Sequence, residues 1–314
     1  GAIPSDPSPG RSDLLAISLT ISLWYAFSVL NNQSAKALLS SLGTPLLTFS
    51  QLIISGVCGA LVLGLSGEKL SLGFSSRAQL WHTSQLAAAF LAGCYSFNAC
   101  LSAMHVSLVM TLRAAEPLTT LLLGMPRSCG LQLAIWLLRE APRRIASLVV
   151  VVVGCALSAL GGHSVSVRSL LFVSLANVCF SLRAILGKRV TTDHGTSPFR
   201  LLFQMCAIGG ALQLLLLLLP ACRPAELNLL IKAASRAAER PFLLLANGVS
   251  FYAQMQLSFV CLTQMTAVSH SLANSMRRPV TIAASLWFEP ARLTSLNWVG
   301  ILLACAGATL YGIL

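Results

Sequence analysis

Charged residues are scarce in this sequence. Asp, Glu, Lys and Arg together make up 10% of its 314 residues, whereas soluble domains carry about 25%. Hydrophobic residues make up 56%, and the mean hydropathy is +0.79. A membrane-spanning helix needs about 20 mostly apolar residues, and the chain contains about ten such runs. We therefore exclude a soluble domain and expect an all-α integral membrane protein surrounded by the lipid bilayer.

Motifs that would indicate other functions are also missing. Lys and Arg exceed Asp and Glu by 21 to 9, a net charge of +12, but no basic run or patch with interleaved aromatic residues predicts nucleic-acid binding. The ten cysteines include no CxxC pair, so neither a metal site nor a disulfide framework is indicated. The sequence has no HExxH, no GxSxG and no second intramembrane acid beside Glu116, and thus lacks the groups for catalysis. We expect no enzyme activity, no metal and no cofactor.

The apolar runs form one membrane domain. We expect it to cover residues 14–314, after a flexible Pro- and Ser-rich tail at residues 1–13. The polar end of the first run, NNQSAK, is expected to face the protein interior, because polar groups exposed to lipid are costly. A charged connection precedes the last three spans. The first seven spans are expected at residues 14–38, 44–65, 80–103, 106–124, 145–160, 167–190 and 201–219.

Two spans carry charges deep in the membrane. Arg277 and Arg278 stand together in the ninth span, inside an apolar stretch at residues 241–288. A cation at the bilayer centre costs roughly 2.5–3.5 kcal/mol, so such residues normally face a cavity or a partner. In the fourth span, Arg113 and Glu116 lie three positions apart, on one helix face. Either these two side chains neutralise each other, or Arg113 reaches a ligand while Glu116 orients it.

An internal repeat relates these two spans. Val106 precedes Pro117 by eleven positions, and Val268 precedes Pro279 by the same eleven, each valine being followed by a serine. Five spans per copy, an odd number, give the copies opposite orientations in the membrane. Inverted repeats of this kind are typical of transporters, in which the substrate site lies near the midplane between the repeats.

The boundaries of the repeats follow from this register. We expect two inverted five-helix repeats, at about residues 14–160 and 167–314, with both termini on the more positive, cytosol-equivalent side. The first copy is longer than the second after its proline. We interpret residues 125–135 as an insertion, either a re-entrant excursion or an intron retained in the gene model.

Four segments carry a resemblance to a known family. They are WYAFSVLNNQSAK in the first span, VSLVMTLRAAEP in the fourth, FSLRAILGKR in the sixth and SHSLANSMRRP in the ninth. In these segments, and over nearly its whole length, the chain resembles the plastid phosphate translocators of the triose-phosphate translocator type. That family belongs to the drug/metabolite transporter superfamily and is related to nucleotide-sugar transporters. The resemblance implies the drug/metabolite transporter fold, with a phosphorylated small molecule and inorganic phosphate as partners.

The resemblance also implies a phosphate clamp. The positions that grip the substrate phosphate in the family correspond to Arg113, Arg277 and Arg278. Two of the three are lysines in the family. Because a guanidinium offers a bidentate fork where an ammonium is a point charge, phosphate binding is expected to survive the substitutions.

The positions that contact the rest of the substrate match less well. Cys94 and Phe97 stand where the family has His and Thr, and Gln254 stands where it has Tyr. The substrate therefore remains open between triose phosphate, another sugar phosphate, phosphoenolpyruvate and a nucleotide sugar. The residues expected to contact it beside the clamp are Cys94, Phe97, Asn98, Thr111, Arg183, Lys188, Gln254 and His270.

Three further basic residues have two interpretations each. His270 is either a packing residue with a hydrogen bond or a group that couples transport to protons. Lys36 and Lys188, which end the first and sixth spans, either reach to the membrane interface or stand at opposite mouths of the cavity.

Charge predicts how such a carrier works. Three arginines with one carboxylate leave the empty site positive, and a bound phosphate ester of about −1.5 to −2 charge offsets this. We expect an antiporter that exchanges a phosphorylated C3–C6 metabolite for phosphate or another phosphate ester by alternating access. The alternatives are a nucleotide-sugar transporter of the same fold and a transport-inactive homologue. The resemblance implies the plastid inner envelope, with a Golgi or endoplasmic-reticulum membrane as the alternative.

Overall fold

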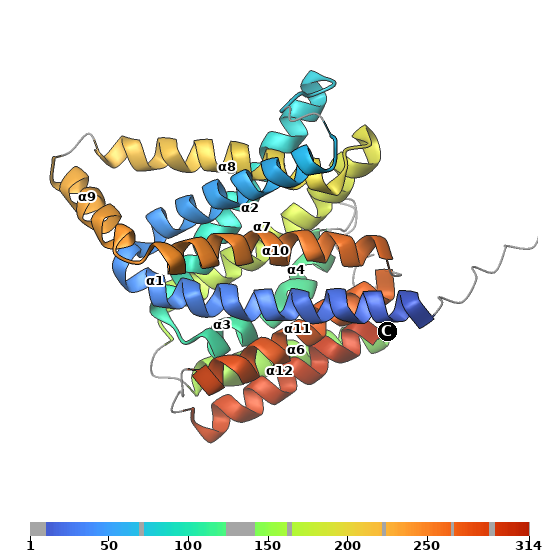
Figure 1. Cartoon of the computed structure of the whole chain (residues 1–314). Coiled ribbons are helices and arrows are strands. Elements are labelled where there is room, and N and C mark those ends of the chain that lie inside the picture. Colours follow the sequence, from blue (N-terminus) through green and yellow to red (C-terminus); the bar gives the residue numbers. More distant parts are fainter. Residues whose placement is uncertain are drawn as a thin grey trace, which may run out of the picture.

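The computed structural model describes residues 11–68, 72–123, 142–161, 165–221, 224–264, 267–288 and 293–313. Every regular element in these ranges is a helix (Figure 1), so the all-α prediction is confirmed. The expected insertion at residues 125–135 lies outside the described residues. The elements are α1 (Arg11–Leu65), α2 (Arg77–Ala103), α3 (Val106–Leu112), the 3₁₀ turn η1 (Arg113–Ala115), α4 (Glu116–Leu123), α6 (Pro142–Leu160), α7 (Val167–His194), α8 (Pro198–Ala221), α9 (Pro224–Ala238), α10 (Pro241–Gln264), α11 (Ala267–Phe288) and α12 (Ser295–Ile313).

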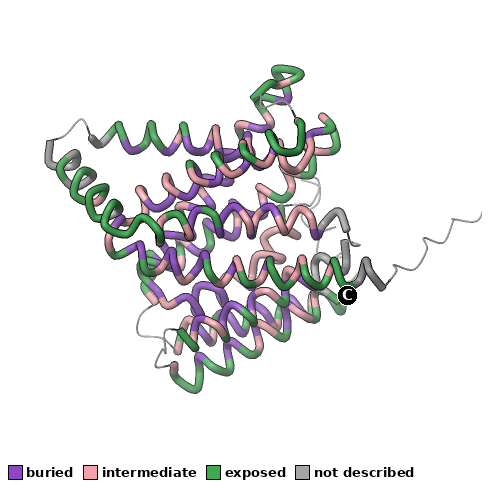
Figure 2. The backbone as a smooth tube through the Cα atoms, in the orientation of Figure 1, coloured by how far each residue is buried: buried purple, intermediate pink, exposed green. Residues whose placement is uncertain are grey.

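The helices match the expected spans with three differences, one of which, the break of the fourth span into α3, η1 and α4, is described with the site. Helix α1 contains the first and second spans together and begins at Arg11, inside the segment expected to be a flexible tail. The charged connection before the last three spans forms a helix of its own, α9, at the edge of the bundle (Figure 1). Most of the described surface of α9 is exposed (Figure 2). Hydropathy could not predict this helix, because it carries too many polar residues to cross a membrane.

The apolar helices have the lengths that a bilayer requires. Within the described ranges, five helical segments are long and apolar enough to cross a membrane, and two shorter apolar helices accompany them. Many of their large apolar side chains, such as Leu61, Leu171 and Leu302, are exposed on the outside of the bundle. An apolar outer surface is what a bundle surrounded by lipid needs.

A single residue separates the first two spans. Gly43 interrupts α1 with φ 69° and ψ 168°, and the helix continues on the other side with Pro45 in its first turn. This positive φ is readily adopted only by glycine, and proline is tolerated in the first turn of a helix. The two spans therefore form a hairpin with no loop between them.

Helix contacts pair off as the internal repeat predicts. The third span, α2, packs along the sixth span, α7. The repeat maps these two onto the eighth and first spans, and these, α10 and α1, are also in extensive contact. The fifth and tenth spans, α6 and α12, are equivalents that pack against each other, as do the second and seventh. The arrangement supports two five-helix halves, although the boundaries of the repeats stay a prediction.

Small residues bring α6 and α12 into backbone contact. A Cβ added at Gly154 would lie 2.4 Å from the backbone nitrogen of Ala304, and one added at Gly300 would lie 2.4 Å from that of Ser158. In a membrane, where lipid is as apolar as leucine, such close approach is a main source of helix association. This pair lies along one side of the bundle (Figure 1).

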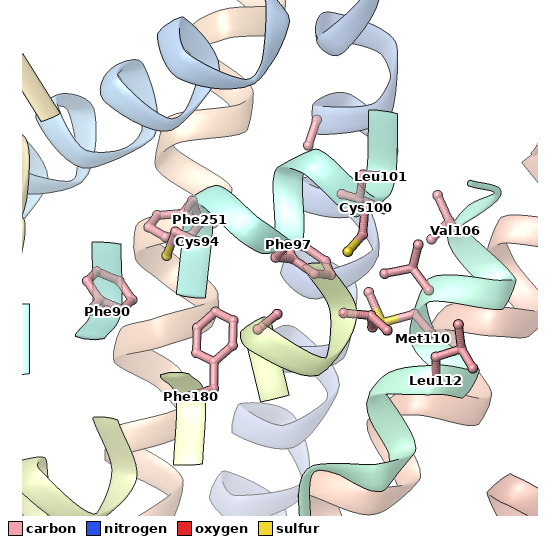
Figure 3. Close-up of a cluster of buried hydrophobic side chains, with 14 of the residues drawn as sticks. Phe90, Cys94, Phe97, Cys100, Leu101, Val106, Met110, Leu112, Phe180 and Phe251 are labelled. Carbon is pink, nitrogen blue, oxygen red and sulfur yellow. The ribbon is translucent and has the colours of Figure 1, made fainter. Parts of the chain in front are cut away.

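The core between α2, α3 and α7 is built from aromatic and sulfur-containing side chains. Figure 3 shows Phe90, Cys94 and Phe97 along α2, with Phe180 of α7 facing them. Phe90 and Phe97 are seven residues, or two turns, apart, so both point to the same side of α2. Two of these rings, Phe97 and Phe180, line the space in which the charged residues meet.

Candidate functional site

A cavity of about 680 Å³ lies inside the bundle. It is lined by residues of both halves, from α1, α2 and α3 through α7, α8, α10 and α11. Among the described residues that line it, five carry a positive charge and one, Glu116, a negative charge. The expected site residues that line it are Cys94, Phe97, Asn98, Arg113, Arg183, Lys188, Gln254, Arg277 and Arg278.

A local break in the fourth span positions Arg113. Pro117 has no N–H to donate to the carbonyl oxygen of Arg113, so the α-helical hydrogen bond at this point cannot form. Instead the N–H of Glu116 donates to that carbonyl, which tightens residues 113–115 into the 3₁₀ turn η1. Short 3₁₀ stretches inside a helix often mark functional positions. Here the turn places Arg113 and Glu116 at the cavity wall.

Glu116 joins the two halves of the protein. Its Oε2 atom accepts a hydrogen bond from Nη2 of Arg113 at 2.6 Å and another from Nη2 of Arg278 at 2.9 Å. Glu116 and Arg278 are equivalent in the repeat, since each stands directly before its proline. The three side chains are 6–20% exposed, and their ion pairs are strong because little water competes. The carboxylate neutralises Arg113 as one interpretation of the sequence expected, but it is shared with Arg278.

Aromatic rings hold the guanidinium groups. The Arg113 guanidinium lies 4.3 Å from the ring centre of Phe180 and 5.2 Å from that of Phe97. The Arg277 guanidinium lies 5.2 Å from the ring of Trp24. Cation–π contacts of this kind are attractive and strengthen when water is excluded. Sequence reasoning missed Trp24, which stands inside the motif WYAFS of the first span without any polar signal to single it out.

Two of the four cavity arginines have no acidic partner. In the described ranges, neither Arg277 nor Arg183 forms an ion pair, whereas Arg113 and Arg278 share Glu116. Since each cation in the membrane interior is costly to keep, an anion bound in the cavity would be stabilised by both. The charges of the cavity would therefore favour a bound anion.

Buried amides form another wall of the cavity. The amide nitrogen of Asn98 donates to Thr48 at 2.9 Å and to Gln51 at 2.8 Å. The Gln51 amide donates to Asn247 at 3.0 Å, and the Asn247 amide donates to Asn31 in turn. These bonds tie α1, α2 and α10 together. The polar NNQSAK segment of the first span had pointed to an interior position, and Asn31 confirms it.

Two predicted residues, Lys36 and Thr111, are not brought to the cavity lining. The Lys36 ammonium donates to the carbonyl oxygens of Leu101 and Met104 at 2.7 and 2.9 Å, where α2 ends. A lysine at that place stabilises the negative end of the helix. The Thr111 hydroxyl donates to the carbonyl of Ser107 at 2.8 Å. His270 belongs to α11, but its side chain lies outside the described residues.

Comparison with known proteins gives one consistent result. The model of the Triose-phosphate Transporter family matches residues 15–312. The chain is 26% identical over 231 residues to phosphoenolpyruvate/phosphate translocator 2, chloroplastic, of Arabidopsis thaliana, an alignment that covers 72% of this chain and 58% of that relative. It is 25% identical to phosphoenolpyruvate/phosphate translocator 3, chloroplastic, of Oryza sativa subsp. japonica, covering 98% of this chain and 78% of the relative.

A further relative is also a phosphate translocator, and a solved structure has a similar fold. The chain is 26% identical to the triose phosphate/phosphate translocator, non-green plastid, chloroplastic, of Brassica oleracea var. botrytis, covering 99% of this chain and 76% of the relative. One crystal structure of a protein matches with a TM-score of 0.56 at 15% identity, over 96% of each chain. At that identity the match shows a shared fold.

Proposed function

Because the chain belongs to the Triose-phosphate Transporter family, we propose that it exchanges a phosphorylated C3–C6 metabolite for inorganic phosphate or another phosphate ester across a membrane. The observation that carries this proposal is the gathering of Arg113, Arg277 and Arg278 at one cavity, from spans 162 positions apart in the repeat. A phosphate dianion accepts several charge-assisted hydrogen bonds, and guanidinium forks suit its geometry. The relatives named above are phosphate translocators, which favours this function over nucleotide-sugar transport.

The proposed coupling follows from the charges of the empty cavity. Glu116 is shared by two arginines, so Arg277 and Arg183 stay uncompensated. Enclosing two such cations costs roughly 2.5–3.5 kcal/mol each. A bound phosphate ester offsets that cost, and the loaded carrier therefore reorients faster than the empty one. Exchange, rather than one-way transport, is the consequence.

The proposed location is the plastid inner envelope. It rests on the relatives, whose names place them in chloroplasts or non-green plastids. A Golgi or endoplasmic-reticulum membrane is the alternative. Localisation of the full-length protein by fluorescence microscopy decides between them.

Proteoliposomes test the proposed function. We expect labelled phosphate to enter vesicles that are preloaded with phosphate at least tenfold faster than vesicles loaded with an inert salt. Equal uptake rates in the two kinds of vesicle would contradict the proposed coupling of uptake to the export of phosphate. If neither kind of vesicle takes up phosphate or phosphate esters, the chain is a transport-inactive homologue.

Within that assay, the variant Arg277→Ala tests most directly whether the clamp binds phosphate. Loss of hydrogen bonds to a charged group costs about 1.5–3 kcal/mol, so the variant should lose about 10- to 100-fold in the rate of phosphate exchange at low phosphate. Arg168→Ala is the matched control, because Arg168 also rests on a phenylalanine, Phe172 at 5.6 Å, but is exposed and outside the cavity lining. Retained exchange in Arg277→Ala would remove this residue from the clamp.

A further inference from the structure

A pair of histidines outside the cavity lining joins two long helices. His82 stands on α2, and His194 is the last residue of α7. The Nδ1 atom of His82 lies 3.3 Å from the Nε2 atom of His194, and the ring centres are 5.6 Å apart. Both side chains are partly buried, and neither lines the cavity. The proposed phosphate clamp makes no use of this pair.

The two histidines lie beside the cavity. On α2, Gln79 precedes His82 by three residues, and its amide donates to the Thr196 hydroxyl at 3.0 Å. On α7, Thr191 precedes His194 by three residues. Both threonines line the cavity, so the histidine pair lies about one helical turn from its lining. The contact therefore ties α2 to the end of α7 next to the cavity.

The spacing of the two nitrogen atoms suits a transition-metal ion. Histidine nitrogens bind Zn²⁺ at about 2.0–2.1 Å in a tetrahedral arrangement, which places two of them about 3.3–3.4 Å apart. The nitrogens of His82 and His194 already have this separation. They now point toward each other, so each ring must turn about its Cβ–Cγ bond before both lone pairs converge on one ion. That torsion is soft in histidine.

The surroundings of the pair suit a cation. Gly195 ends α7 with φ 60° directly after His194, and the free carbonyl oxygens of a helix end favour positive charge in the last turn. The neighbouring charges of α7, Arg189 and Asp193, pair with each other at 3.7 Å, and both are more than half exposed. In the described ranges, no third His, Cys, Asp or Glu completes a metal-binding group with the two histidines. Water would take the remaining coordination positions, as it does in open metal sites.

We propose that His82 and His194 bind a divalent transition-metal ion such as Zn²⁺, and that the bound ion slows transport. Binding is independent of the proposed function, whereas the effect on transport rests on it. By the expected boundaries of the repeats, α2 belongs to the first half and α7 to the second. Inverted-repeat carriers move one part of the fold against another during transport. An ion bonded to both helices resists any movement that separates them.

Zinc titration of the purified protein tests the site. The full chain, without a polyhistidine tag, is titrated with Zn²⁺ in detergent by isothermal titration calorimetry. We expect the wild-type protein to bind, and either His82→Ala or His194→Ala to bind at least tenfold more weakly, since loss of even an outer-shell partner costs about 10–100-fold. Affinity should also fall from about pH 7.5 to about pH 5.5, because only unprotonated imidazole binds a metal.

The matched control is His105→Asn. His105 is another partly buried histidine, and it caps α3, a role that asparagine can keep. This variant should bind Zn²⁺ as the wild-type protein does. No binding by the wild-type protein, or an affinity that neither His82→Ala nor His194→Ala changes, overturns the site.

Phosphate exchange in proteoliposomes tests the effect of the ion. At a Zn²⁺ concentration about tenfold above its dissociation constant, about nine-tenths of the carriers hold the ion, so exchange by the wild-type protein should fall about tenfold and recover with EDTA. Exchange by His82→Ala should stay the same. This variant meets the same free zinc, and thus also controls for zinc that binds phosphate.

The outcomes of the two assays can be told apart. Equal inhibition of the wild-type protein and His82→Ala, or a wild-type protein that binds zinc and exchanges phosphate at its full rate, overturns the effect on transport. If the proposed function itself fails, the protein exchanges no phosphate with or without zinc, and the titration still decides whether the two histidines bind the ion.

Discussion

Glu116 is the residue on which the charge balance of the cavity depends. Its carboxylate holds Arg113 from one half of the protein and Arg278 from the other. In the empty carrier it occupies two arginines that we propose as phosphate ligands. The phosphate must therefore compete with Glu116 for Arg113 and Arg278, whereas Arg277 on its Trp24 ring is ready to bind. Under the proposed function, Glu116 therefore lowers both the free-energy cost of the empty cavity and the affinity of the cavity for phosphate.

Glu116→Gln should separate these two effects. Leaving buried charges without their partner typically costs about 3–5 kcal/mol, so the phosphate-free variant should melt at a lower temperature than the wild-type protein. Phosphate should then restore more stability to the variant than to the wild-type protein, because a ligand stabilises the folded state more when it binds more tightly. Thermal unfolding in detergent, with and without phosphate, measures both.

The matched control is Glu68→Gln. Glu68 also pairs with an arginine, Arg200 at 3.2 Å, but about a third of its side chain is exposed and it lies outside the cavity lining. This variant should gain no more from phosphate than the wild-type protein does. An equal phosphate response in Glu116→Gln and Glu68→Gln would contradict the competition described for Glu116.

Among single residues, the sequence indicated the charged residues of the cavity but not the aromatic residues that contact them. Arg113, Arg277 and Arg278 could be singled out because a charge inside an apolar run requires an explanation. Trp24 and Phe90 carry no such signal, since an aromatic residue in a membrane helix is ordinary. Lys36 was noticed because of its charge, but its partner could not be predicted. A lysine at a helix end can equally reach a cavity or the carbonyls of a neighbouring helix. Only the tertiary packing decides between those partners.

Among the elements, the α6–α12 pair has the tightest geometry. Glycines on both helices bring the backbones together, and neither helix lines the cavity. The pair lies on one side of the bundle, away from α8 on the other side (Figure 1). It can therefore serve as a fixed base while the helices around the cavity move.

Gly154→Ala should loosen that base. The new Cβ would lie 2.4 Å from the backbone nitrogen of Ala304, and a clash with backbone cannot be relieved by a side-chain rotation. Overpacking of this kind typically costs about 1–3 kcal/mol, so the midpoint of thermal unfolding should fall. Gly64→Ala is the control, because a Cβ there meets nothing within 4 Å. A Gly154→Ala protein as stable as Gly64→Ala would refute the close approach.

Most elements could be read from the sequence, with limits that have physical causes. Apolar runs of the right length predicted the spans because the bilayer imposes that length. The same criterion missed α9, whose polar residues suit an edge position. The 3₁₀ turn at residues 113–115 was also missed, although Pro117 was the available signal. A proline changes the backbone four residues before itself, and its effect there depends on which hydrogen bonds replace the lost one.

In the whole molecule, a contact between two helices, one from each half, is made, whereas the contact between the equivalent residues is not. The Thr119 hydroxyl lies 2.6 Å from that of Ser181, joining α4 to α7. The repeat maps Thr119 onto Thr281 and, through a shared Phe-Ser pair, Ser181 onto Ser28. Both of these equivalents line the cavity. Each threonine donates to a carbonyl of its own helix, Thr119 to Glu116 and Thr281 to Arg277, but no hydrogen bond joins the described side chains of Thr281 and Ser28. A contact made between one pair of helices and absent from the equivalent pair is what inverted repeats predict for a carrier open to one side.

Cysteine pairs test this asymmetry. The double variant Thr119→Cys/Ser181→Cys should form a disulfide rapidly upon oxidation and stop exchange until it is reduced. The equivalent Ser28→Cys/Thr281→Cys should form its disulfide more slowly, because it must wait for the opposite state. Gel mobility and phosphate exchange after oxidation measure both, with the oxidised wild-type protein as control for the native cysteines. Equal rates for the two pairs would mean that the contacts do not alternate.

The repeat was the one long-range feature that the sequence could predict. Two copies of a Val-Ser to Pro register were enough to expect inverted halves, and the helix contacts support them. Which contacts are made at a given moment could not be predicted, since both arrangements use the same residues in exchanged roles. The same holds for Glu116, whose two partners come from different halves and meet only after the halves have packed.

The hairpin at Gly43 has a consequence for how the chain is made. No water-soluble segment separates the first two spans, so they reach the insertion machinery as one continuous apolar stretch. Neither span can settle in the bilayer before the other without leaving the turn stranded in lipid. We expect the pair to enter the membrane together, as a preformed hairpin, and this step of insertion to depend on a single glycine.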